Sequence, residues 1–234
     1  MANTKSYSLG PGLSTAEQVV GFCYLPFYVS LLSVLLQHLS GLLGLELTQL
    51  QHNICYFSIN CIIVWIIFHN FLIRSFRGIR FWELVQALIL GFVMYYVGNF
   101  LYAALMTWLK IDLTNYNDKI ITMLIEQGRI PMIICGVILV PIVEETLTRG
   151  LIFGVIRRKS RVAAYIISIL FFSAIHVWQY VRVDNIRSIL FAALQYVPAG
   201  IALGWTYEKS NTIWAPILLH MTINAISFGV MSFL

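Results

Sequence analysis

Hydrophobic residues in this chain fall into long, nearly uninterrupted runs that are separated by short polar stretches. Each run approaches or exceeds the roughly 20 residues that a helix needs to cross the hydrocarbon core of a bilayer. The seven runs cover residues 19–43, 54–73, 84–109, 130–156, 162–181, 188–207 and 212–233. This pattern predicts an all-α protein, a polytopic transmembrane bundle of about seven helices.

The polar stretch 110–129 is a candidate for an eighth helical segment. Its apolar residues, Ile120, Ile121, Leu124 and Ile125, recur at helical spacing. Such a stretch is too short to span a membrane but is typical of an interfacial or re-entrant helix. The bundle therefore has seven helices, or eight if this segment is counted.

The composition agrees with a membrane protein. Of 234 residues, 59% are hydrophobic and only 11% are charged, whereas a soluble domain carries about 25% charged residues. No long repeat, low-complexity segment or separate soluble domain is visible, so residues 1–234 are expected to form one integral membrane domain. The polar stretch 1–18 precedes the first run without a cleavage-site pattern, so that run is expected to remain as a span. A short chain without appended domains is more typical of a bacterial protein.

The basic residues predict how the bundle is oriented, because Lys and Arg in short loops stay on the cytoplasmic side. Nine fall on one side, namely Lys5, Arg74, Arg77, Arg80, Arg157, Arg158, Lys159, Arg161 and Lys209. Five fall on the other, namely Lys110, Lys119, Arg129, Arg182 and Arg187. We therefore expect a multi-pass protein of the cell membrane with a cytoplasmic N-terminus and, with seven spans, a C-terminus outside. The bias accounts for the net charge of +5, so nucleic-acid binding is not expected.

The four cysteines give no sign of a disulfide framework or a zinc site. Cys23, Cys55, Cys61 and Cys135 lie in or beside apolar runs and show no CxxC spacing. We expect them to behave as small buried hydrophobic residues.

Three charged residues lie inside the apolar run 130–156, namely Glu144, Glu145 and Arg149. A charged side chain near the bilayer centre costs roughly 2.5 to 3.5 kcal/mol, so these residues need a reason to be there. Glu145 and Arg149 are spaced i, i+4 and can pair, whereas adjacent helix residues point about 100° apart. Glu144 is therefore expected to face a cavity. The alternative is that all three form only a structural ion-pair cluster.

Polar side chains occur in two further apolar runs. His176 suits proton exchange near neutral pH, although a lone histidine before Trp178 can also be an interfacial residue. His220 and Asn224 are spaced i, i+4 and can both donate hydrogen bonds to an oxyanion or, alternatively, between helices.

Prolines and glycines mark irregular or closely packed positions in these helices. Pro141 and Pro216 each precede a polar residue by four positions, and each removes a main-chain hydrogen bond, so helix kinks are predicted there. The GxxxG pattern at 200–204 predicts close helix packing.

Three ordered motifs resemble those of a known family. Glu144-Glu-Thr-Leu-Thr-Arg149, Phe172-Ser-Ala-Ile-His176 and His220-Met-Thr-Ile-Asn224 match its EExxxR, FxxxH and HxxxN motifs in order and spacing. The chain thus resembles the CAAX protease and bacteriocin-processing (CPBP, Abi) family of intramembrane glutamic endopeptidases. The resemblance covers about 130–228, the expected catalytic core, while 1–129 contains family-variable N-terminal spans.

The resemblance implies an active site inside the bundle and a metal-independent protease activity. Glu144 and His176 would polarise a water, His220 and Asn224 would stabilise the oxyanion, and Glu145 and Arg149 would support them. No metal or other cofactor is expected, and the partners are the lipid bilayer and a membrane-associated peptide or protein. Some family members cut prenylated proteins behind the lipidated cysteine, while others mature peptides or confer bacteriocin immunity.

Three other functions compete with this interpretation. A non-catalytic immunity or scaffold protein could bind a peptide or partner in the same cavity. A transporter or proton relay also tolerates buried Glu and His, but it predicts two matching halves with inverted repeats or broken helices, and neither is visible. A metalloenzyme is disfavoured because HExxH is absent and the candidate ligands lie in separate runs.

Overall fold

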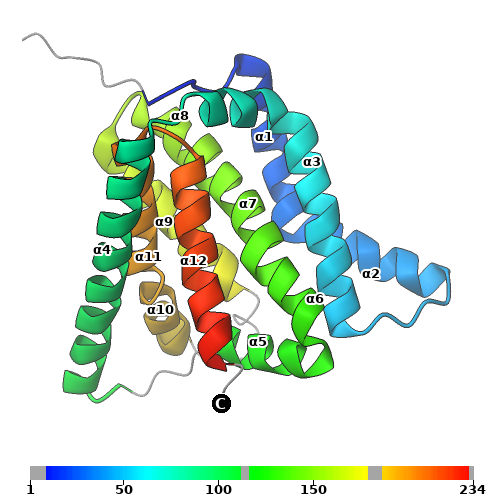
Figure 1. The fold of residues 1–234 in the computed structure, drawn as a ribbon. Helices are drawn as coiled ribbons and strands as arrows, with labels where there is room; N and C mark the ends of the chain where they lie inside the picture. The colour runs from blue at the N-terminus through cyan, green and yellow to red at the C-terminus, as the bar shows by residue number, and fades with distance from the viewer. Residues whose placement is uncertain (1–8, 112–115, 179–185, 232–234) are drawn as a thin grey trace, which may run out of the picture.

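The computed structural model describes residues 9–111, 116–178 and 186–231, and within these ranges all regular secondary structure is helical. Lys5, Arg182 and the ends of the predicted runs at 181 and 233 lie outside the described residues. Figure 1 shows the helices gathered into one bundle. The first half contains α1 (Thr15–Pro26), η1 (Phe27–Leu31), α2 (Leu32–Leu42), α3 (Gln49–Arg77), α4 (Phe81–Trp108) and α5 (Tyr116–Gln127).

The second half carries the three motifs. It contains α6 (Arg129–Ile133), η2 (Ile134–Leu139), α7 (Val140–Glu145), η3 (Thr146–Phe153), α8 (Gly154–Arg157), α9 (Arg161–Val177), α10 (Ile186–Leu194), α11 (Val197–Ser210) and α12 (Trp214–Met231). The segments marked η are π-helical, with wider turns than an α-helix. Consecutive segments from α6 to α8 form one continuous helix, 129–157.

The all-α prediction is confirmed, and helices occupy all seven predicted runs. In the part of the chain that the structure describes, five helical stretches are long and apolar enough to cross a membrane: 15–42, 49–77, 81–108, 129–157 and 186–210. Helix α9 is a shorter apolar helix of 17 residues. Helix α5 lies where the eighth segment was expected and contains all four apolar residues of that prediction. These helices indicate a multi-pass membrane protein.

Polar side chains cap several helices where the apolar runs begin. The Ser14 hydroxyl accepts from the Glu17 main-chain N–H, and the Glu17 carboxylate accepts from the Ser14 N–H, which makes a capping box before α1. Thr48 and Gln51 make the same pair before α3. Both pairs satisfy N–H groups that a helix start otherwise leaves without partners.

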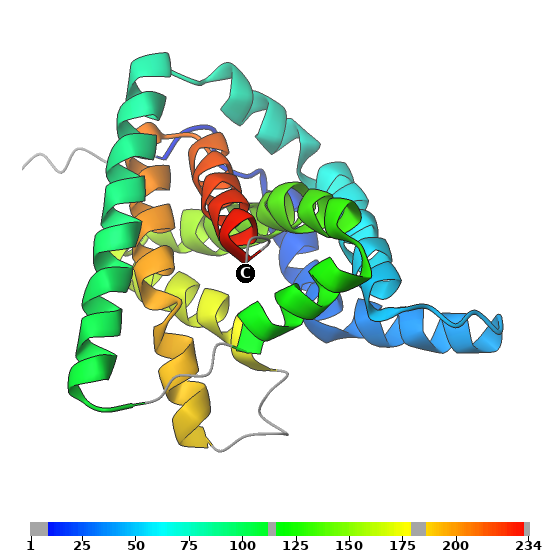
Figure 2. The same cartoon turned by 60° about the horizontal axis from the view of Figure 1, so that its bottom comes forward.

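The first predicted span is bent rather than straight. Pro26 ends α1 and is followed at once by the π-helical turn η1, and both features are known causes of helix bending. Figures 1 and 2 show α1 beside α3, whereas α2 turns away from the bundle. Leu42 is 70% exposed, so α2 keeps most of its apolar surface outside the protein.

The two predicted proline kinks have different outcomes. Pro141 lies in the first turn of α7, and the π-helical turn η2 directly precedes it, so the helix is irregular where irregularity was expected. Pro216 lies in the first turn of α12. A main-chain N–H in the first turn of a helix has no partner within that helix, so a proline there removes no hydrogen bond from α12. The physical reason for the kink predicted at Pro216 is therefore absent.

The GxxxG prediction of close packing is confirmed. A Cβ at Gly200 would lie 2.7 Å from Ile169 Cγ1, and one at Gly204 would lie 3.0 Å from the Tyr165 ring. Helix α11 therefore contacts α9 closely through two positions where a side chain would be crowded.

The prediction for the cysteines is correct only in part. All four are free thiols, and Cys135 is buried, but Cys23 and Cys55 are exposed on the outside of the bundle. In a bilayer that surface faces lipid, where a thiol is tolerated as an apolar side chain.

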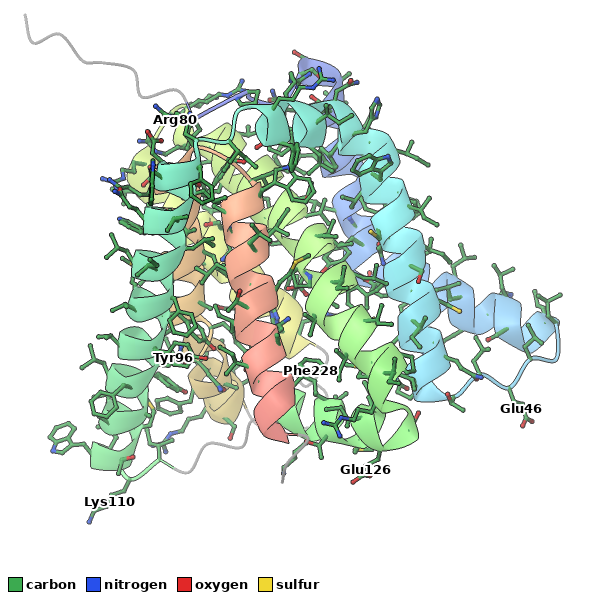
Figure 3. The ribbon with its side chains drawn as sticks, in the orientation of Figure 1. Glu46, Arg80, Tyr96, Lys110, Glu126 and Phe228 are labelled. Carbon is green, nitrogen blue, oxygen red and sulfur yellow. The ribbon has the colours of Figure 1, made fainter. Side chains whose placement is uncertain are left out.

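The two ends of the bundle differ in their charged residues (Figure 3). We call one the arginine-rich end; its described basic residues are Arg74, Arg77, Arg80, Arg157, Arg158, Lys159, Arg161 and Lys209. The other, the α5 end, carries Glu46, Lys110, Lys119, Glu126, Arg129 and Arg187. The helix 129–157 runs from the α5 end to the arginine-rich end, and α12 runs in the opposite direction (Figure 1).

Candidate active site

The predicted site residues come from three helices and meet near the middle of the bundle. Glu144 and Glu145 end α7, and Arg149 follows in η3. A cavity of about 420 Å³ is lined by Glu144, His176, His220 and Asn224, the four residues predicted to act on substrate. Glu145 and Arg149 do not line it and are completely buried behind it. The fold thus places four of the six residues along the cavity and the other two behind it.

Glu144 and His176 face each other across this cavity. His176 Nε2 lies 3.7 Å from Glu144 Oε2, too far for a direct hydrogen bond. The other carboxylate oxygen, Oε1, accepts a hydrogen bond of 3.4 Å from the Tyr28 hydroxyl. Glu144 Oε2 is buried and makes no hydrogen bond within the described residues. One oxygen of the carboxylate is therefore held in place and the other remains available.

The His176 ring is fixed on its opposite side. Nδ1 lies 2.7 Å from the Phe172 carbonyl oxygen; because a carbonyl can only accept, Nδ1 donates. Nε2 of the neutral ring then presents its lone pair. The ring also packs against Phe172 and Tyr196, with centroids 4.6 and 4.3 Å away. His176 is thus oriented toward the cavity, which disfavours the interpretation as a residue of the interfacial aromatic belt.

Glu145 is the centre of a buried polar cluster. Arg149 Nη1 donates to its Oε1 at 2.9 Å, which confirms the predicted i, i+4 pair. The same oxygen lies 2.9 Å from His220 Nδ1, a contact that was not predicted. The Arg149 guanidinium also lies 4.4 Å from the centre of the Phe172 ring, a cation–π contact. Glu145 therefore joins the helix of the first motif to the helix of the third.

Asn224 makes the interhelical hydrogen bond that was considered as its alternative role. Its Nδ2 donates to the Gly136 carbonyl oxygen at 2.8 Å. Gly136 lies in η2, and a Cβ there would lie 2.3 Å from the Phe228 ring, so glycine allows α12 to come close. The Asn224 amide still lines the cavity and has a second N–H to offer.

Sequence reasoning missed three aromatic residues of this site. Tyr28, in η1, is buried and holds Glu144, and the Tyr56 hydroxyl donates to the Tyr28 carbonyl oxygen. Phe172 packs against Arg149, His176 and His220. Phe172 belongs to the FxxxH motif, which was a usable signal. The tyrosines belong to N-terminal runs rich in aromatic residues, where nothing distinguished them.

Of the residues that the structure describes, no group of three or more His, Cys, Asp or Glu side chains is arranged to hold a metal ion. The acidic and imidazole groups instead form two pairs, Glu144 with His176 and Glu145 with His220.

Residues 126–226 match the family model described as "Type II CAAX prenyl endopeptidase Rce1-like". This confirms the resemblance drawn from the three motifs, and the matched segment contains all six predicted site residues. No curated protein and no solved structure matches the chain. The family match indicates a membrane protease.

Proposed function

We propose that this protein is an intramembrane glutamic endopeptidase, which hydrolyses a peptide bond in a membrane-associated peptide or protein with a water activated by Glu144 and His176. One observation carries the proposal: the two side chains face each other at 3.7 Å in a cavity, each oriented by a further contact. The match of residues 126–226 to a family of endopeptidases supports the reaction class.

The spacing of Glu144 and His176 suits a water held by both. Polar groups more than 3.5 Å apart are commonly bridged by a water. Such a water donates one hydrogen bond to Glu144 Oε2 and the other to His176 Nε2, and its oxygen lone pair is left to attack the substrate carbonyl carbon. Glu144 takes the water proton as the C–O bond forms, and gives it to the amide nitrogen as the C–N bond breaks.

The negative charge that develops on the carbonyl oxygen requires hydrogen-bond donors. Asn224 supplies its second Nδ2–H, and the Gly136 carbonyl holds that amide in one orientation. Because Nδ1 donates to the Glu145 carboxylate, His220 donates to the oxyanion through Nε2 only as an imidazolium, with both ring nitrogens protonated. Losing one oxyanion donor typically costs about 2.7 to 4 kcal/mol of transition-state stabilisation.

Glu145 and Arg149 act as positioning residues in this scheme. Neither touches the cavity, but Glu145 fixes the His220 ring, and Arg149 balances the Glu145 charge in a place without solvent. A buried carboxylate without such partners would be strongly destabilising.

Hydrolysis of a fluorogenic peptide mixture by the purified, detergent-solubilised protein tests the proposal, with Glu144→Gln as the inactive variant. The matched control is Glu126→Gln, the same change at an exposed residue of α5 that does not line the cavity. We expect turnover by the parent and by Glu126→Gln, and none by Glu144→Gln. Equal turnover by all three proteins would refute the role of Glu144, and a parent without turnover on any peptide would favour a non-catalytic binding protein.

A further inference from the structure

The cavity is closed toward one end of the bundle. On the arginine-rich side of Glu144 and His220, the next turns of their helices carry Leu147, Leu151 and Ile217, each with 0% exposure. These residues belong to one apolar core that also includes Phe68 and Phe71 of α3. We call this core the apolar plug. It separates the cavity from the arginine-rich end.

Toward the α5 end the cavity lining includes polar and exposed residues beside the apolar Ile120, Ile121 and Leu124 of α5. Glu144 is buried, His52 and Ser227 are half-buried, and Gln37 and Gln49 are exposed, although all five line the same cavity. Gln49 and His52 lie in the first turn of α3 and Ser227 lies near the C-terminal end of α12, and both helix ends are at the α5 end (Figure 1), whereas Gln37 comes from α2. The cavity therefore opens at that end.

The polar groups near the opening are uncharged. Among the described residues, the lining includes the side-chain amides of Gln37, Gln49, Asn53, Asn99, Gln195 and Asn224. Glu144 is the only Asp, Glu, Lys or Arg among the described lining residues. Amides can donate to and accept from a peptide main chain, but they cannot compensate a charged side chain or a phosphate.

The distribution of Lys and Arg assigns a side of the membrane to each end. Among the described residues, eight Lys and Arg lie at the arginine-rich end and four at the α5 end, which predicts that the arginine-rich end is cytoplasmic. The open end of the cavity then faces away from the cytoplasm.

We propose that substrate reaches this cavity from the extracytoplasmic face, and that the cavity takes an extended, uncharged peptide segment of a membrane-bound or exported peptide. This inference rests on the proposed endopeptidase function, which it narrows to one side of the membrane and one class of substrate. The main chain of the segment hydrogen-bonds the amides near the opening, and its scissile carbonyl reaches Glu144.

Thiol labelling in right-side-out spheroplasts tests the side of access. Single cysteines are introduced by Ser227→Cys, at the opening, and by Ser160→Cys, an exposed residue at the arginine-rich end; the two changes are chemically identical and alter no charge. The parent for both carries alanine at Cys23, Cys55, Cys61 and Cys135. A charged methanethiosulfonate reagent that cannot cross the membrane is added outside the spheroplasts. We expect it to label the cysteine at position 227 at once, and the cysteine at position 160 only after the membrane is permeabilised. Labelling at 160 from outside, or at 227 only after permeabilisation, would overturn the inference.

Cleavage in cells tests the substrate class. A peptide stretch that the purified protein hydrolyses is placed in a single-span reporter, either just outside or just inside the membrane. We expect cleavage only of the outer version, and none by Glu144→Gln. A charged residue within the stretch should lower kcat/KM roughly tenfold or more, because the uncharged amides at the opening cannot balance its charge.

Cleavage of the inner version alone, as for the tail of a cytoplasmic lipidated protein, would refute the inference while leaving the proposed function intact. Failure of the purified parent to hydrolyse any peptide would refute the proposed function, whereas the labelling pattern would still decide the side of access.

Discussion

Neutralising Glu145 should damage the protein in a different way from neutralising Glu144. Glu145→Gln keeps the shape of the side chain and an oxygen that can accept from Arg149 and His220. It removes the negative charge, however, and leaves a guanidinium with 0% exposure without a counterion. Breaking a buried ion pair in this way typically costs about 3 to 5 kcal/mol. Because the hydrogen-bond geometry survives, we expect a value near the lower limit, about 3 kcal/mol.

Glu144→Gln should cost much less stability, because Glu144 lines the cavity and its Oε2 has no hydrogen-bond partner to lose. Turnover should disappear even so. Glu145→Gln should lower both the melting temperature and turnover, and adding Arg149→Met should recover part of the stability by removing the uncompensated charge. Turnover should stay low in the double variant, since His220 has lost its carboxylate partner.

The measurement is the melting temperature in detergent together with peptide turnover, for the parent, the two single variants and the double variant. The decisive comparison is Glu145→Gln against the parent. If Glu145→Gln is inactive yet as stable as the parent, its carboxylate takes part in the chemistry, and the assignment of Glu145 as a positioning residue is wrong. Full turnover by Glu144→Gln would refute the assignment of Glu144 as the base.

Three further predictions concern the parts around this cluster. Tyr28→Phe removes the hydrogen bond to Glu144; because such a bond is worth about 0.5 to 1.5 kcal/mol, kcat should fall about 2- to 10-fold with little change in KM. The matched control is Tyr24→Phe, since Tyr24 does not line the cavity. Equal effects of the two changes would contradict a role for Tyr28 in holding Glu144. Asn224→Ala removes an oxyanion donor and should lower kcat about 10²- to 10³-fold. It should also lower the melting temperature, because the Gly136 carbonyl loses its hydrogen-bond donor. A lower melting temperature with normal kcat would mean that Asn224 has only its interhelical role. Strong chelators should leave turnover of the purified protein unchanged, because the proposed water is activated by side chains; loss of turnover that added zinc restores would require a metal mechanism.

Local features of this protein could be predicted from the sequence because they depend on hydrophobic run length and helical spacing. The positions of the helices and the Glu145–Arg149 pair follow from these alone. Contacts between distant segments have no such signal. His220 lies 75 positions from Glu145, and Tyr28 lies 116 positions from Glu144. The motifs indicated which residues gather, but the pairing of His220 with Glu145 depends on how α12 packs against α7.

The bend in the first run illustrates the same limit. Pro26 could be read from the sequence as a possible helix bend, but a proline in a membrane helix does not reveal the direction of the following segment. The packing of α1 against α3 and the departure of α2 are tertiary features (Figure 2). They bring Tyr28 to Glu144, and so the N-terminal run completes a site whose motifs all lie in the second half of the chain.

The apolar plug also has an electrical consequence. A polar, water-accessible cavity carries the potential of its own side deep into the bundle, as far as Glu144. The membrane voltage must then fall mainly across the thin layer that contains Leu147, Leu151 and Ile217. Moving one elementary charge across 100 mV is worth about 2.3 kcal/mol, and an apolar layer without polar groups opposes the passage of protons through the bundle. The Glu144 carboxylate, which lines the cavity, then lies outside most of that field.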